Sequence, residues 1–228
     1  MRWTKWTLAA LFLAGLAAEP VAAQQVPSAP QARFMVVLDA AHGGEETGGR
    51  LANGQFEKTF TLALTMRLRS LLGARGIQVV TTRESDAAVV PEKRTEIANH
   101  AAAQACLSLH ASESGTGVHL FVSSLAPAQP VRFPAWKTAQ GASVSRSLKL
   151  AGVVNSALLQ AGISTTLART TLPMIDSMTC PALAVEIAPE RSALHETTAG
   201  LGDPDYQARV AAALAAALVE WRTEAHQP

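Results

Sequence analysis

Short, continuous apolar runs alternate with longer segments of helical periodicity along most of this 228-residue chain. The runs Phe34–Leu38, Ala105–His110 and Ala182–Ala188 are typical of strands buried on both faces of a sheet. Between the first two, the apolar residues of Phe56–Leu72 recur at helical spacing. Because strands that alternate with helices build a sheet covered on both faces, we predict a single-domain, three-layer α/β sandwich with a mostly parallel or mixed central sheet.

The remaining elements follow from the same patterns. We expect further strands at Ile77–Thr82 and Val118–Val122, and further helices at Pro91–Ala103, Ser145–Ala161 and Asp203–Trp221. Residues 123–142 hold three prolines and little periodicity, so we predict a long loop. In this loop Trp136 either covers a small core of the loop itself, which we expect, or stacks on a sugar or covers the site.

Residues 1–23 have the features of a signal peptide. Arg2 and Lys5 precede an apolar run that is shorter than the ~20 residues a membrane-spanning helix needs. Residues 21–23 (VAA) then form a small-residue cleavage site. We therefore expect an exported, periplasmic or secreted protein whose mature chain begins near Gln24. An uncleaved signal would instead tether the protein to a membrane.

The charge of the chain is balanced, which argues against a nucleic-acid partner. It carries 19 basic and 18 acidic residues, and 17 of each without Arg2, Lys5 and Glu19 of the signal. A nucleic-acid surface needs a clustered basic excess. We also expect no stable membrane insertion after signal cleavage, because no other apolar run is long enough to span a bilayer.

Two cysteines, Cys106 and Cys180, lie in or beside expected core strands. An exported compartment permits a disulfide between them. Two buried free thiols are an equally consistent interpretation, and the spacing is not that of a zinc-binding C-x-x-C pair. The bonding of these cysteines is therefore left open.

Four polar residues stand where core strands end or a helix begins: His42, Glu57, His110 and Glu186. Taken singly, a strand-end histidine is usually a hydrogen-bonded structural residue, and a glutamate in a first helical turn is favoured by the helix dipole. Glu186 is different, because a carboxylate in an apolar strand needs a partner or a cavity. Together, two imidazoles and one carboxylate suit a catalytic zinc ion, and a second carboxylate suits a general base.

Five blocks of the chain resemble, in order, the motifs of the zinc-dependent N-acetylmuramoyl-L-alanine amidases of the amidase-3 type. They are VVLDAAHGG (36–44), FEKTFTLALTMRLRSLL (56–72), GIQVVTTRESD (76–86), EKRTEIANHAAAQACLSLHAS (92–112) and PALAVEIA (181–188). The resemblance covers residues 35–221, almost the whole mature chain. It implies an amidase-3-like catalytic domain at 34–228, and the polar, proline-bearing residues 24–33 before it are expected to form a flexible leader.

Carried over residue by residue, the resemblance makes His42, Glu57 and His110 the ligands of one zinc ion and Glu186 the catalytic acid/base. The implied reaction is hydrolysis of the amide bond between N-acetylmuramic acid and L-alanine in peptidoglycan. Asp39 would orient a ligand histidine or merely cap the turn. The pair Gly43-Gly44 would keep side chains away from the metal and the substrate.

The chain departs from the family pattern at three places. It has DAAH where D-P-G-H is usual, SLHASE where S-x-H-A-N is usual, and IAPERSALHE after Glu186 where a Gly-Phe pair and an asparagine are usual. These changes leave every metal and acid/base group in place and affect turn geometry and substrate contacts.

Two alternatives remain beside the amidase: a catalytically silent peptidoglycan-binding module of the same fold, and a zinc peptidase that cuts within the stem peptide. We expect a monomer that binds peptidoglycan. The requirement for a protein activator is left open.

Overall fold

The structure is a computed structural model that describes residues 33–132 and 135–225. The expected signal peptide (1–23) and all of the expected leader except its last residue lie outside the described residues. Within the described ranges, none of the helices combines the length and the apolar character that crossing a bilayer requires.

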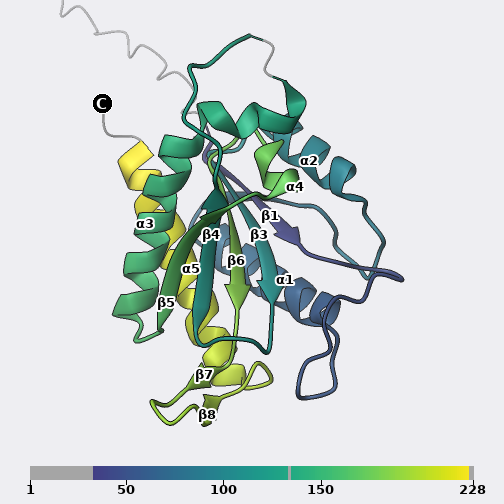
Figure 1. Cartoon of the computed structure of the whole chain (residues 1–228), viewed down its shortest axis with the longest axis vertical. Coiled ribbons are helices and arrows are strands. Elements are labelled where there is room, and N and C mark those ends of the chain that lie inside the picture. The colour runs from purple at the N-terminus through teal and green to yellow at the C-terminus, as the bar shows by residue number, and fades with distance from the viewer. Residues whose placement is uncertain (1–32, 133–134, 226–228) are drawn as a thin grey trace, which may run out of the picture. The chain divides into compact units, whose positions relative to one another are not determined.

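A mixed six-stranded sheet with helices on both faces forms the centre of the fold (Figure 1), which confirms the predicted three-layer α/β architecture. The strands lie in the order β2-β1-β3-β6-β4-β5. Neighbours β2, β1, β3 and β6 are parallel, β4 is antiparallel to β6, and β5 is parallel to β4. The six strands are β1 (Met35–Ala40), β2 (Gln78–Thr81), β3 (Ala105–Ala111), β4 (Val118–Ser123), β5 (Thr165–Thr170) and β6 (Ala182–Ile187).

The helices and a small hairpin complete the fold. The helices are α1 (Glu57–Gly73), α2 (Pro91–His100), the 3-10 helix η1 (Trp136–Ala142), α3 (Val144–Gln160), α4 (Pro173–Asp176) and α5 (Pro204–Ala225). The hairpin pairs β7 (Glu190–Arg191) with β8 (Thr197–Ala199).

Alternation along the strands divides the interior into two cores. On β3, Leu107 and Leu109 enter the larger core, which also contains residues of α1, α3 and α5. Cys106 enters the smaller core on the other face, beside α2 and α4. Because side chains two apart share a face, Ser108 and His110 lie on the side of the smaller core.

The direction of the strands brings functional side chains to one edge. Strands β1, β3 and β6 are parallel, so their carboxyl ends meet there, at His42, His110 and Glu186. Strand β4 runs the opposite way, so His119, near its beginning, lies at the same edge. Polar groups far apart in the chain are therefore gathered by topology alone.

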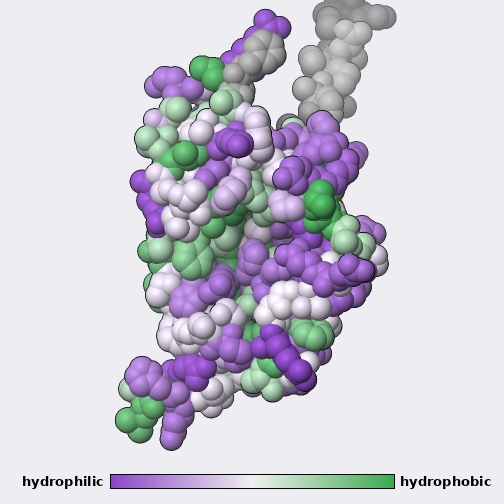
Figure 2. All heavy atoms as spheres, turned by 45° about the vertical axis from the view of Figure 1, so that its right-hand side comes forward, coloured by the Kyte–Doolittle hydropathy of each residue, from purple (hydrophilic) through white to green (hydrophobic). Residues whose placement is uncertain are grey.

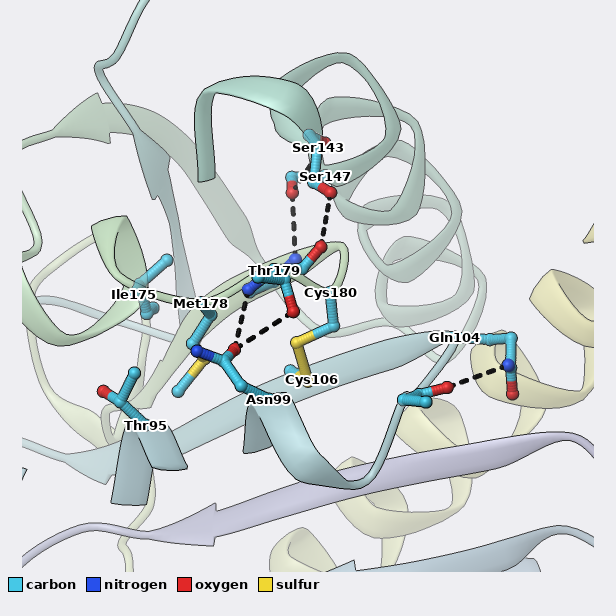
Figure 3. Close-up of a disulfide and its surroundings, with 12 residues drawn as sticks. Thr95, Asn99, Gln104, Cys106, Ser143, Ser147, Ile175, Met178, Thr179 and Cys180 are labelled. Carbon is cyan, nitrogen blue, oxygen red and sulfur yellow. Dashed lines mark hydrogen bonds between the residues drawn. A yellow bond between two sulfur atoms is a disulfide. The ribbon is translucent and has the colours of Figure 1, made fainter. Parts of the chain in front are cut away.

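The two cysteines are joined by a disulfide that ties β3 to the segment leading into β6 (Figure 3). The neighbouring Thr179 is held from two sides. Its backbone N–H donates to the side-chain oxygen of Asn99 on α2 (2.8 Å), and its carbonyl accepts from the hydroxyl of Ser143 before α3 (2.7 Å). The disulfide, and not a pair of free thiols, is therefore the state of Cys106 and Cys180 in the structure.

Several short elements differ from the sequence prediction. Strand β5 was not predicted because its sequence, TTLART, has little apolar periodicity: it is an edge strand that is mostly exposed. The expected loop 123–142 contains η1, and α4 is only four residues long. Short or exposed elements leave little hydrophobic periodicity to detect.

We expect removal of the disulfide to destabilise the domain substantially. The bond closes a loop with a sequence separation of 74 residues. Loop-closure entropy then predicts a loss of about 4 kcal/mol in the free energy of unfolding of the C106A/C180A double variant. Urea denaturation of the oxidised protein and the variant would measure this loss. Equal transition midpoints, or a midpoint of the oxidised protein unaffected by reductant, would contradict it.

Candidate metal centre

His42 follows β1 in a backbone conformation that is uncommon for a residue with a side chain. Its φ is 62°, in the left-handed region, where a non-glycine residue costs free energy. The guanidinium of Arg94, on α2, donates to the His42 carbonyl at 2.7 Å. The same guanidinium donates to the Ala40 carbonyl at 2.6 Å, so a buried arginine holds the turn that presents the imidazole.

Glu57 is the first residue of α1, and its side chain contacts Gly48 and Gly49 in the preceding loop, called the glycine loop below. The side chain is buried, and its two carboxylate oxygens accept backbone N–H groups from Gly49 (3.0 Å) and Ala111 (3.1 Å). Gly48 packs directly over it. A Cβ at Gly48 would lie 2.6 Å from the His42 ring and 2.7 Å from a Glu57 oxygen, and its φ is +66°, so only glycine fits there.

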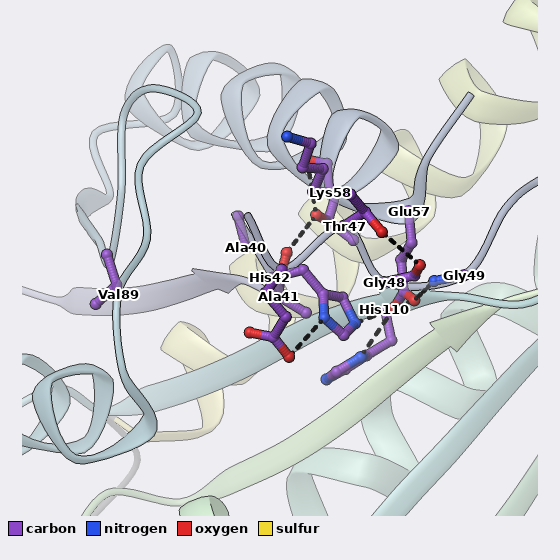
Figure 4. A network of polar contacts seen from close by, with 12 residues as sticks. Ala40, Ala41, His42, Thr47, Gly48, Gly49, Glu57, Lys58, Val89 and His110 are labelled. Atoms are coloured by element: carbon purple, nitrogen blue, oxygen red, sulfur yellow. Dashed lines mark hydrogen bonds and ion pairs between the residues drawn. The ribbon is translucent and has the colours of Figure 1, made fainter. Parts of the chain in front are cut away.

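The carboxylate of Glu57 lies between two imidazoles (Figure 4). One oxygen is 3.0 Å from Nε2 of His42, and the other is 3.1 Å from Nδ1 of His110. The two rings are nearly perpendicular, at 88°, with centroids 5.7 Å apart. Three side chains from β1, α1 and β3 thus point toward one small volume.

Each imidazole is also held through its other nitrogen. Nδ1 of His42 is 3.1 Å from the carboxylate of Glu46, and Nε2 of His110 is 3.3 Å from the hydroxyl of Ser108. That hydroxyl donates to Asp39 at 2.7 Å. When the inner nitrogens bind a metal ion, the outer nitrogens carry the ring protons, and Glu46 and Ser108 are placed to accept them.

The ionisation of these groups is coupled. Burial works against the charge of Glu57, but hydrogen bonds from His110, His42 and the two backbone N–H groups outweigh it and hold the pKa of the carboxyl well below its ordinary value. The hydrogen bond to Glu57 raises the pKa of His42 above its ordinary value, against the effect of burial, and Glu46 adds to the rise. Glu57 is therefore an anion at neutral pH.

The arrangement fits a metal ion. One ligand atom from each of His42, Glu57 and His110 lies within 4.8 Å of the other two. Ligands bound ~2.1 Å from a tetrahedral zinc ion lie about 3.4 Å from one another, and the imidazole nitrogens lie 3.0 and 3.1 Å from the oxygens of Glu57. Two neutral imidazoles and one carboxylate form a donor set that leaves the fourth position open for water or substrate.

Glu186 lies beside this group on the adjacent strand. It is the register partner of His110 on β3 and of His119 on β4. Residues directly opposite on neighbouring strands point to the same face, so the Glu186 carboxylate is on the face of the metal-binding group. It is half-buried, and among the described residues none donates a hydrogen bond to it, which leaves its oxygens free to accept a proton.

A buried ion pair between Asp39 and Arg94 lies beside the two histidines. Asp39 and Arg94, 1% and 4% exposed, contact each other at 2.7 Å. The hydroxyl of Thr82 also donates to Asp39 at 2.7 Å. Asp39 therefore contacts the ligand histidine only through Ser108, so it neither binds the imidazole directly nor caps a turn alone.

A cleft of about 210 Å³ opens beside the metal-binding group, on the face of α2 and α4. Its polar end includes His42, His110 and Ser108, and its apolar wall is formed by Leu172–Ile175. On the side of the molecule turned forward in Figure 2, hydrophobic surface occupies small areas among hydrophilic ones. The apolar wall is thus a local feature beside polar groups, as is usual for a binding site.

The four residues singled out from the sequence therefore lie at one edge of the sheet, three of them in mutual contact range. Glu46 and Gly48 were missed, because a glycine loop gives no periodic signal. The expected role of Gly43-Gly44 was wrong: a Cβ at Gly43 would lie 2.2 Å from the Ala87 carbonyl oxygen and one at Gly44 would lie 2.9 Å from Ala88. Both glycines are needed for packing against a neighbouring loop.

Comparison with known proteins identifies the family of this chain. The family model described as N-acetylmuramoyl-L-alanine amidase matches residues 36–220. Over 77 residues, 34% of this chain, the sequence is 40% identical to N-acetylmuramoyl-L-alanine amidase AmiA of Escherichia coli. That segment spans only 27% of the length of AmiA.

Solved structures share the fold over most of the chain. The catalytic domain of CwlV, an N-acetylmuramoyl-L-alanine amidase from Bacillus (Paenibacillus) polymyxa, superposes with a TM-score of 0.65 at 26% identity, covering 83% of this chain and 98% of that domain. The CwlD amidase of Clostridioides difficile, solved in complex with the GerS lipoprotein, has a TM-score of 0.65 at 18% identity and covers 84% of this chain and 100% of its own. The second likeness concerns the fold alone.

We expect Ser108→Ala to weaken metal binding without unfolding the protein. The substitution removes the hydroxyl that holds the outer nitrogen of His110, and loss of such a partner costs ~10- to 100-fold in metal affinity. Competition with a chromophoric chelator, with zinc as the probe, would measure the affinity. Ser123→Ala, which removes a buried hydroxyl on β4 away from the site, is the matched control. Wild-type affinity in Ser108→Ala would contradict the role of Ser108.

Proposed function

We propose a function for this chain from the premise that it belongs to the N-acetylmuramoyl-L-alanine amidase family, whose model matches residues 36–220. The proposed reaction is hydrolysis of the amide bond between N-acetylmuramic acid and the L-alanine of the peptidoglycan stem peptide. The observation that carries the proposal is the group of His42, Glu57 and His110 within 4.8 Å of one another, with Glu186 opposite His110 on the next strand.

The proposed cofactor is one zinc ion held by His42, Glu57 and His110. When bound, zinc supplies a Lewis acid that lowers the pKa of water toward ~7 and polarises a carbonyl group. The anionic Glu57 and the two imidazoles that face it support this assignment, because nitrogen and carboxylate ligands with one open position are typical of catalytic zinc.

Glu186 is the proposed acid/base. In this role its carboxylate accepts a proton from the attacking water and later gives it to the departing amine of L-alanine. Two observations support the assignment: Glu186 shares the face of His110, and its oxygens accept no hydrogen bond from any described residue. A carboxylate already saturated by donors would be a weaker base.

The proposed site of action is the cell wall outside the cytoplasm. The N-terminal sequence supports export, through a signal peptide at residues 1–23 and a mature chain that starts near Gln24. The proposed catalytic domain is 34–228, acting on peptidoglycan as a monomer. A protein activator is a further proposed partner, since a protein of the same fold, CwlD, was solved in complex with a lipoprotein.

We expect Glu186→Gln to bind zinc as the wild type does and to lose activity. Glutamine keeps the shape of the side chain but cannot accept the proton, and loss of a general base lowers kcat by about a thousandfold. Metal analysis and hydrolysis of purified muropeptides would test both parts. Glu190→Gln serves as the control. Glu190 lies four residues after Glu186 in the chain, and its carboxylate is paired with Arg209. An undiminished rate in Glu186→Gln would assign the base elsewhere.

We expect the wild-type products to be free stem peptides that begin with the amino group of L-alanine. Mass spectrometry of muropeptides digested by the zinc-loaded protein would identify them. Fragments cut within the stem peptide would establish a peptidase instead. Binding of muropeptides without any cleavage by the zinc-loaded protein would establish a silent binding module.

A further inference from the structure

Trp136, the first residue of η1, does not cover a core of its own loop, contrary to the expectation from the sequence. Its side chain is 63% exposed. An indole offers a large, flat apolar face together with one N–H donor, and such a face beside a cleft is suited to binding a ligand. The ammonium of Lys137 lies 5.2 Å from the ring centroid, a cation–π distance.

The indole lines a second cleft beside the cleft of the metal centre. This second cleft, of about 190 Å³, lies between α2, α4 and η1. Pro91, Pro173 and Met174 line both clefts, so the cleft of Trp136 adjoins the cleft of the metal-binding group. Lys137 is not among the residues that line it.

Buried hydrogen bonds hold the end of η1 that follows Trp136. The amide of Gln140, which is fully buried, donates to the carbonyls of Met178 (3.0 Å) and Cys180 (2.9 Å). The hydroxyl of Ser147 donates to the other end of the same amide at 2.6 Å. These contacts tie the end of η1 that carries Gln140 to the segment of the disulfide, and Trp136 lies at the other end of the same short helix, beside Pro173 and Met174 of α4.

We propose that the second cleft binds a sugar ring of the glycan strand next to the amide bond that is cleaved, with the ring stacked on Trp136. The proposal rests on the proposed amidase function and adds a saccharide subsite to it. A pyranose ring presents a face of C–H groups that packs on an indole, while its hydroxyl and N-acetyl groups point outward. Because the two clefts adjoin, such a ring lies beside the metal centre.

The polar groups of the second cleft select for hydrogen-bond donors. The hydroxyls of Thr95 and Ser177 donate their own hydrogens to the carbonyls of Met174 and Pro173, which leaves them only lone pairs to offer a ligand. Glu92 contributes a carboxylate, another acceptor. Sugar hydroxyls and the N-acetyl N–H are donors. The backbone N–H groups of a stem peptide are donors as well, so the choice of the sugar depends on the exposed indole of Trp136, whose face matches the C–H face of a pyranose.

The first arm of the test measures, by NMR titration, how tightly the full chain binds the peptide-free disaccharide of N-acetylglucosamine and N-acetylmuramic acid. This arm does not depend on catalysis. We expect Trp136→Ala to weaken binding about tenfold, because the stacked face is lost, and Trp136→Phe to retain most of the affinity. Leu159→Ala, which truncates an exposed side chain on α3 at the opposite face of the sheet, is the control.

The second arm compares two substrates: the disaccharide-peptide, and the same peptide carrying only a lactyl group. We expect the ratio of kcat/KM for the first substrate over the second to fall about tenfold in Trp136→Ala, mainly through KM. Equal losses on both substrates, or unchanged disaccharide binding, would overturn the saccharide subsite. An inactive wild type that still binds the disaccharide through Trp136 would refute the amidase function and leave the subsite standing.

Discussion

The carboxylate of Glu57, held between the imidazoles of His42 and His110, is the interaction on which the rest of the site depends. A buried anion is costly unless it is paired and hydrogen-bonded, and here two imidazoles and two backbone N–H groups contact it. These contacts come from three separate parts of the chain: the turn at His42, the loop at Gly49, and β3. The group can form only when β1, the glycine loop, α1 and β3 have all reached their native positions.

The surrounding structure is organised to keep the two imidazoles in place. One outer nitrogen is held by Glu46, and the other is held by Ser108 in contact with Asp39. Asp39 is in turn paired with Arg94, whose guanidinium also binds the backbone of the turn at His42. A single buried ion pair therefore supports both histidines. Such a pair adds little net stability, but its loss would leave a buried charge uncompensated.

Much of this arrangement can be predicted from the sequence, and the parts that cannot have a physical reason. Continuous apolar runs predict core strands such as Ala182–Ile187, and Glu186 is conspicuous because it interrupts such a run. The pattern of β1, β3 and β6 as parallel strands then predicts that His42, His110 and Glu186 meet at one edge. The resemblance of five ordered blocks to a known family adds Glu57, which has no distinguishing feature of its own.

Other features depend on tertiary contacts that carry no local signal. Strand β5 is exposed at the sheet edge and lacks alternation, and the roles of Gly43 and Gly48 follow from what a Cβ would meet in space. Ser108 lies two residues before His110 on the same face, a spacing that can be read in advance, but its link to Asp39 requires the register of β1 with β3. The exposure of Trp136 likewise depends on how η1 packs against α4.

The most direct test of the central claim is a crystal structure of the zinc-loaded protein with anomalous diffraction data collected at the zinc edge. The account predicts one anomalous peak, about 2.1 Å from Nε2 of His42, Nδ1 of His110 and a carboxylate oxygen of Glu57. A peak elsewhere, or a bound ion from which any of these three side chains is turned away, would contradict it.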